Sequence, residues 1–93
     1  MTLLLKDPGA VLDYAVDWGA EYLSNDVLTE SSWTVHPAEP GGLSMIANSF
    51  DAVSSTVQAG GGNVGRVYRL TNHVVTGEGR EDSRSIVVRV EKR

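Results

Sequence analysis

The sequence contains no cysteine, so it can form neither a disulfide bond nor a thiolate metal site. Histidine occurs only as His36 and His73, and neither has a histidine or carboxylate two positions away, the spacing that would put two ligands on one face of a strand. No apolar run approaches the roughly 18 residues that span a membrane, and the segment before Lys6 is too short for a signal peptide. We therefore expect no metal, no other cofactor, no membrane partner and no export.

Basic residues are almost missing from the first half of the chain. The net charge of −4 argues against a nucleic-acid partner. Residues 1–51 hold eight acids and one base, a net charge of −7, whereas residues 52–93 hold four acids and seven bases, a net charge of +3. Either the two halves form neighbouring strands whose charges pair across a sheet, or the molecule has two faces that stack head to tail in an assembly.

The chain is organised around residues 65–90. Two runs rich in β-branched and aromatic residues flank Gly77-Glu78-Gly79, which is typical of a β-hairpin with a longer loop. Because apolar residues recur with a period of two, one face of each strand should pack and the other should meet water. The expected packed positions are Tyr68, Leu70, Val74, Ile86, Val88 and Val90.

Two polar side chains on the packed face of this hairpin need hydrogen-bond partners. Tyr68 follows Gly65 closely, and its hydroxyl is suited to bond back to a loop backbone, as in the tyrosine corner of immunoglobulin-type domains. Asn72 is the odd member of the inward face. Since a buried amide must find partners, we expect it to satisfy backbone groups near a sheet edge.

Four further strands are expected, over residues 11–18, 26–36, 43–50 and 52–58, with a flexible connection over 59–63. Trp18 and Trp33 are expected core anchors. Strand runs separated by short turn signals predict an all-β sandwich of about six or seven strands. We expect residues 1–7 to form an N-terminal arm and residues 8–93 a single domain; the arm supplies a first edge strand, docks on a neighbour or is disordered.

Nothing in the sequence has the pattern of a catalytic or nucleotide-binding motif. The glycine-rich segment 60–65 lacks the lysine and hydroxyl residue of a phosphate-binding loop, and no helix is expected after it. A serine nucleophile needs a base close to it in space, and none of the serines has one nearby in sequence. We therefore expect no enzymatic activity.

Several segments together carry a resemblance to a known family. Residues 68–72 and 79–90 resemble the closing hairpin of Ig-like and PKD-like sandwiches. This resemblance implies that residues 8–93 form a single Ig-like or PKD-like antiparallel β-sandwich domain. With Lys6-Asp7-Pro8, the strand 13–18, residues 32–35 and the Gly60-Gly61 turn, the chain resembles small proteins encoded in tailed phages and prophages, some of them labelled fiber–tail adaptors. The most specific parts are the Lys-Asp-Pro segment, the Asp-Tyr-x-x-Asp-Trp strand and the Gly-Arg-x-Asp-x-Arg-Ser turn at 79–85.

The resemblance implies a non-catalytic virion structural protein, an adaptor joining the tail fiber to the tail. It would be made in the host bacterial cytoplasm, located in the virion, and bound to other virion proteins in a symmetric assembly. The residues expected to contact partners are Leu3, Leu4, Leu5, Lys6, Arg80 and Arg84. Three other functions stay open: a capsid decoration or head–tail joining protein, a carbohydrate-binding or adhesion module, and a small hydrolase, which would need a cleft with His36 or His73 near a serine. The carbohydrate reading would need Trp18, Tyr22 or Trp33 exposed as an aromatic platform.

Overall fold

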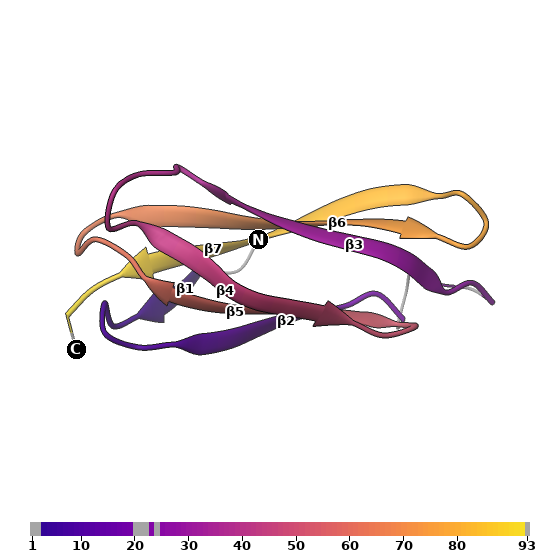
Figure 1. The fold of residues 1–93 in the computed structure, drawn as a ribbon, viewed down its shortest axis with the longest axis horizontal. Coiled ribbons are helices and arrows are strands. Elements are labelled where there is room, and N and C mark those ends of the chain that lie inside the picture. The colour runs from indigo at the N-terminus through magenta and orange to yellow at the C-terminus, as the bar shows by residue number, and fades with distance from the viewer. Residues whose placement is uncertain (1–2, 20–22, 24, 93) are drawn as a thin grey trace.

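The computed structural model describes residues 3–19, 23 and 25–92, and this part of the chain is built from strands without a helix (Figure 1). The predicted all-β fold is confirmed. The strands are β1 (Leu3–Lys6), β2 (Leu12–Asp17), β3 (Leu28–His36), β4 (Leu43–Phe50), β5 (Ser54–Gly61), β6 (Val67–Thr76) and β7 (Glu81–Val90).

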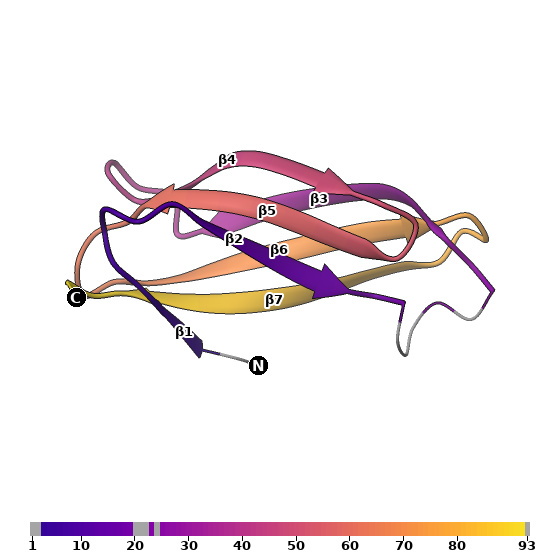
Figure 2. The ribbon, with the colours of Figure 1, turned by 90° about the horizontal axis from the view of Figure 1, so that it is seen from below.

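Two sheets pack face to face as a β-sandwich (Figure 2). One sheet has four strands in the order β1-β7-β6-β3, and the other has three in the order β2-β5-β4. All pairings are antiparallel except that of β1 with β7, which is parallel. Without β1, the two orders match the C-F-G and B-E-D strands of constant-type immunoglobulin domains, and so are compatible with the Ig-like prediction.

The N-terminal leucines belong to the sandwich of their own chain. Leu3 to Lys6 pair with Val87 to Val90 of β7. This segment therefore forms an edge strand of its own domain, which was one of the expected possibilities. Lys6 is fully buried, and its ammonium donates to the carbonyl oxygens of Asp7 at 2.8 Å and Gly61 at 2.7 Å. Because Gly61 ends β5, this contact ties β1 to the opposite sheet.

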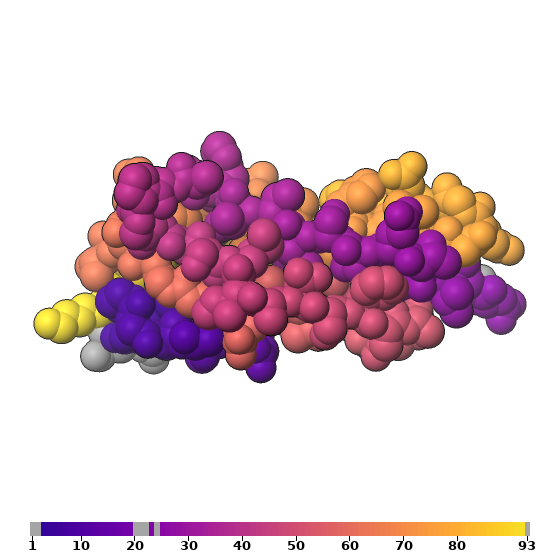
Figure 3. All heavy atoms as spheres, in the orientation of Figure 1, coloured from indigo at the N-terminus to yellow at the C-terminus, as the bar shows by residue number. Residues whose placement is uncertain are grey.

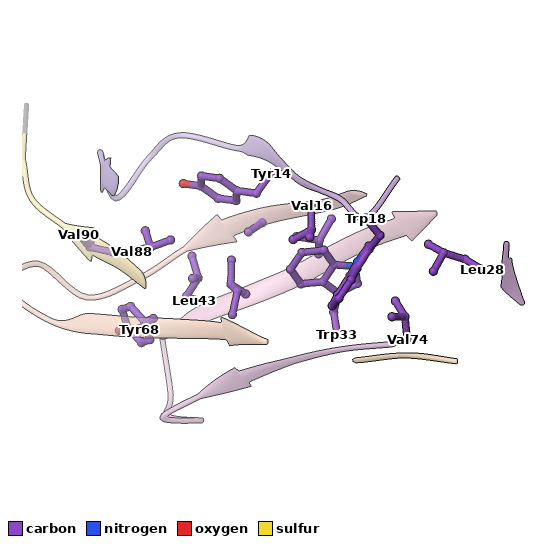
Figure 4. Packing of buried hydrophobic residues seen from close by; sticks show 13 residues of the cluster. Tyr14, Val16, Trp18, Leu28, Trp33, Leu43, Tyr68, Val74, Val88 and Val90 are labelled. Atoms are coloured by element: carbon purple, nitrogen blue, oxygen red, sulfur yellow. The ribbon is translucent and has the colours of Figure 1, made fainter. Parts of the chain in front are cut away.

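The core lies between the sheets, on the faces that the period-two pattern predicts (Figure 4). Trp18 is fully buried and Trp33 is 5% exposed, so both are core anchors as expected. Of the positions predicted to pack in the hairpin, Ile86 is partly buried and the others are fully buried.

A chain of hydrogen bonds crosses this core and joins the two tryptophans. Trp18 Nε1 donates to Asn72 Oδ1 at 2.8 Å, and Asn72 Nδ2 donates to Ser31 Oγ at 2.9 Å. The Ser31 and Ser55 hydroxyls lie 2.6 Å apart, and Trp33 Nε1 donates to Ser55 Oγ at 2.9 Å. As expected, the Asn72 amide bonds to a backbone group near a sheet edge, because its Nδ2 also donates to the Ser32 carbonyl of the edge strand β3 at 3.0 Å. Its other two partners are side chains, which the sequence did not predict.

The predicted flexible connection at 59–63 is wrong for its first three residues. Ala59, Gly60 and Gly61 continue β5 and pair with Met45, Ser44 and Leu43 of β4. Glycine serves packing here rather than flexibility: a Cβ on Gly60 would lie 2.8 Å from Ile46 Cδ1 and 3.3 Å from Val11 Cγ2. The missing side chain leaves room for these two residues to close over the strand.

The predicted tyrosine corner is present at the start of β6. The Tyr68 hydroxyl accepts a hydrogen bond from the Asn63 backbone N–H at 2.9 Å and donates to Glu39 Oε1 at 2.7 Å. Arg66 Nη2 lies 2.8 Å from Glu39 Oε2. The hydrogen bonds from Arg66, Tyr68 and Asn63 lower the pKa of Glu39 to about 2.

Some of the opposite charges of the two chain halves pair with each other within the molecule. Besides the pair of Arg66 with Glu39, Arg80 Nη2 lies 3.2 Å from Asp26 Oδ2. Asp26 also accepts the Glu78 backbone N–H at 3.2 Å, and its hydrogen bonds, that of the Thr76 hydroxyl foremost, lower its pKa. These two pairs connect loops that are distant in sequence. Glu39 between β3 and β4 pairs with Arg66 between β5 and β6, and Asp26 before β3 pairs with Arg80 between β6 and β7.

Candidate partner-binding surface

The outer face of the four-stranded sheet gathers apolar and basic side chains beside β1. Strand register sets two neighbouring rows across the sheet: Leu3, Val87, Arg69 and His36 form one, and Leu5, Arg89 and Val67 form the other. Residues paired in register share one side of a sheet, so these side chains point away from the core. We call the surface of Leu3, Leu5, Val67, Arg69, Val87 and Arg89 the basic face.

Three apolar members of the basic face are exposed to solvent, and the fourth, Val87, is half-buried. Leu3 is 56% exposed, Leu5 47% and Val67 48%. Beside them lies a hollow of about 580 Å³ lined by His36, Pro37, Val67, Tyr68, Arg69 and Val87. Adjacent exposed apolar residues beside a hollow are a feature of surfaces that bind other molecules.

Two guanidinium groups give this face its charge. Arg89 Nε lies 2.6 Å from Glu91 Oε1, with both side chains about half exposed. Among the described residues, no hydrogen bond or ion pair engages the Arg69 side chain, which stands exposed between Val87 and His36 in its row. Arginine with apolar neighbours is enriched at protein interfaces, and Arg69 is placed to meet a carboxylate of a partner.

The structure separates the residues expected to bind partners. Leu3 and Leu5 lie on the basic face, whereas Leu4 points inward against the core and Lys6 is buried. Arg80 pairs with Asp26 at the far turn. The Arg84 guanidinium stacks 4.4 Å from the Trp18 ring centroid, and its Nη1 donates to the Asp17 carbonyl at 3.2 Å.

Sequence reasoning did not select Arg69, Arg89, Val67 and Val87, although a signal was present. All four alternate with the packed residues of the hairpin, so their outward direction follows from the period-two pattern. What the pattern lacks is the parallel pairing with β1, because only that register brings Leu3 and Leu5 beside them.

Strand register also creates a serine–histidine–glutamate line farther along the same sheet. His73 lies opposite Ser83, with Nδ1 2.8 Å from Ser83 Oγ and Nε2 3.0 Å from Glu81 Oε1. A serine nucleophile also needs donors for the oxyanion, commonly including its own backbone N–H. The Ser83 N–H donates to Asp82 Oδ1 at 2.8 Å, and the side chains of Ser83, His73 and Glu81 form a hydrogen-bonded chain across β6 and β7.

Other kinds of site find little support in the described part of the chain. Residues 3–19, 23 and 25–92 contain no cluster of three or more His, Asp or Glu side chains arranged to hold a metal ion. They likewise contain no helix with the length and apolarity needed to cross a bilayer. Burial of Trp18 and Trp33 removes two of the three residues considered for an aromatic carbohydrate platform; the third, Tyr22, lies outside the described residues.

Comparison with known proteins identifies a family. The model of the family described as podophage GP4 fiber-tail adaptor protein gp77 matches residues 6–89, from the last residue of β1 to the penultimate residue of β7. No curated protein matches the chain.

Proposed function

The chain belongs to the podophage GP4 fiber-tail adaptor family, and on that premise we propose that it is a non-catalytic virion protein that joins a fiber to the tail. It is made in the host bacterial cytoplasm and enters the particle by binding other virion proteins. Its mechanism is recognition by a rigid sandwich, in which exposed side chains on regular strands make the contacts.

The observation that carries this proposal is the alignment of Leu3 and Leu5 with Val67 and Val87 beside Arg69. These apolar side chains project from three paired strands, so their spacing is fixed before a partner arrives. A preorganised surface loses little conformational entropy on binding. We therefore assign the contact with a neighbouring virion protein to the basic face.

The absence of catalysis is part of the proposal. The line of His73, Ser83 and Glu81 joins β6 to β7 on an open face, and the Ser83 N–H is already used by Asp82. We expect particles carrying Ser83→Ala to assemble and infect like the wild type. A loss of infectivity with normal assembly would instead indicate that this group does chemistry.

The proposal is tested by complementing a phage that lacks the gene. The variant is Leu3→Ser with Leu5→Ser, because these side chains are exposed and their loss leaves Lys6 and the β1–β7 pairing in place. Purified particles should lack both this protein and the fiber. The matched control is Val27→Ser with Val53→Ser, which removes two valines that are 47% and 44% exposed away from the basic face. Normal fiber content with the Leu3/Leu5 variant would overturn the assignment.

Capsid decoration and head–tail joining are the other virion roles that a small sandwich can serve. Loss of this protein from the particle with fibers still attached would favour those roles over the adaptor role. Loss of both, with intact heads and tails, is the result that the adaptor proposal requires.

A further inference from the structure

The outer face of the three-stranded sheet carries the opposite charge to the basic face. From Asp7 to Gly65 the sequence has no lysine or arginine, so β2, β4 and β5 contribute no basic side chain. Asp13 and Asp17 alternate with the buried Tyr14, Val16 and Trp18 and therefore point outward from β2.

Exposed apolar side chains stand next to these acids. A register shift between Met45 and Ala47 leaves Ile46 outside the regular β4–β5 pairing, and Ile46 and Val11 close over Gly60 on this side. Ile46 is 55% exposed and Val11 53%. We call the surface of Val11, Asp13, Asp17 and Ile46 the acidic face; Figure 3 shows the β4 segment exposed along the middle of one side of the molecule.

Val11 and Ile46 of the acidic face lie at the same end of the molecule as the basic face, on the opposite side of the sandwich. Gly60, beneath Val11 and Ile46, is next to Gly61, whose carbonyl accepts the Lys6 ammonium at 2.7 Å. Lys6 follows Leu5 of the basic face and pairs with Val90. In Figure 2, β2 and β5 lie above β1 and β7 at this end, in the opposite layer of the sandwich.

We propose that the neighbour bound by the basic face is a second copy of this chain, docking through its acidic face. Arg69 of one copy faces Asp13 of the next, and Leu3, Leu5 and Val67 cover Val11 and Ile46. Among the described residues, neither Arg69 nor Asp13 has a charged partner within its own chain. This inference rests on the proposed function and names the neighbour.

Such a contact joins two different surfaces and is therefore heterologous, so it repeats from copy to copy. A repeating heterologous contact closes into a ring or continues as a filament. An adaptor built this way would present several identical sandwiches around one axis, and would assemble faster at low salt, where opposite charges attract over longer distances.

The test exchanges the two charges between variants. Arg69→Glu places a carboxylate opposite Asp13 of the next copy, and Asp13→Lys places an ammonium opposite Arg69. Each variant alone should therefore self-associate at least about tenfold more weakly than the wild type, because like charges then meet at this contact. In a one-to-one mixture, the new carboxylate at position 69 of one variant meets the new ammonium at position 13 of the other, and association should return. Sedimentation velocity at low ionic strength measures all four samples, and Glu78→Lys controls for net charge because it makes the same change as Asp13→Lys in the exposed β6–β7 turn.

Three results would overturn the inference: a wild-type chain that stays monomeric over the accessible concentrations, single variants that associate like the wild type, or a mixture no better than its components. The proposed function has a separate readout. Loss of fibers with Leu3→Ser/Leu5→Ser, together with a mixture that does not associate, would mean that the basic face binds a different virion protein.

Discussion

Trp18 donates its indole N–H to Asn72 Oδ1 at 2.8 Å, a hydrogen bond that joins the end of β2 in one sheet to β6 in the other. Asn72→Ala removes this acceptor and the donor to Ser31. Buried polar groups left without partners are costly, so we expect the free energy of unfolding to fall by about 2–4 kcal/mol. Urea denaturation followed by tryptophan fluorescence measures the change.

The neighbouring residue gives the control for this prediction. Thr71 is half-buried on the outer side of β6, with its hydroxyl 2.9 Å from Ser85 Oγ, so Thr71→Ala should cost no more than about 1 kcal/mol. Equal losses in the two variants would show that the inter-sheet network adds nothing beyond an ordinary surface contact.

Glu39 predicts an acid-dependent loss of stability. Its folded pKa of about 2 lies below the ordinary value of 4.5, so its contribution is present above pH 4.5 and disappears as the pH falls towards 2. Asp26 and Asp51 also have lowered pKa values and contribute to the pH dependence of the wild type. The contribution of Glu39 is therefore measured as the difference in unfolding free energy between the wild type and Glu39→Gln at each pH. The stability difference between the two should shrink steadily across this window; a difference independent of pH would contradict the assignment.

Lys6 fastens β1 to the rest of the sandwich. Lys6→Ala takes away a fully buried stem and leaves the Gly61 carbonyl without its ammonium donor, so we expect a loss of about 2–4 kcal/mol in the free energy of unfolding. Lys92→Ala, which changes the same residue type at an exposed position, should stay within about 0.5 kcal/mol. Thermal unfolding at neutral pH measures the stability of both variants. A loss for Lys6→Ala no larger than that for Lys92→Ala would contradict this role of Lys6.

Gly62 and Gly65 form a matched pair of positive-φ glycines. A Cβ on Gly62 (φ 107°) would lie 2.6 Å from Val90 Cγ2, whereas one on Gly65 (φ 85°) would meet nothing within 4 Å. Gly62→Ala should therefore destabilise the fold by at least about 1 kcal/mol more than Gly65→Ala, through overpacking added to backbone strain. Similar melting temperatures for the two variants would mean that the Val90 side chain can move aside without loss of stability.

The strands were predictable because their apolar period is two wherever one face is buried. The expected strand at 43–50 coincides with β4 (Leu43–Phe50), and the expected packing of Tyr68, Leu70 and Val88 is found. Tyr68 was also predictable in its role, since its place between a glycine turn and a core strand leaves its hydroxyl near a loop backbone.

What local patterns missed depends on contacts between distant segments. Ala59 to Gly61 look like a flexible loop until β4 pairs with them, and Asn72 finds its partners on other strands. The basic face needs β1 to run parallel to β7, a pairing that no local spacing records. Arg80 and Arg84 look like exposed charges in sequence. In the structure, Arg80 forms an ion pair with Asp26 and Arg84 stacks on the Trp18 ring.

The central claim is that this chain sits where a fiber meets the tail, and its most direct test is antibody-gold labelling of purified virions from the phage that encodes it. We expect gold at the base of the fibers, and none on particles complemented with Leu3→Ser/Leu5→Ser. Gold over the head would contradict the adaptor role and favour decoration or head–tail joining. Unlabelled virions, with the protein found only in the lysate, would contradict a place in the particle altogether.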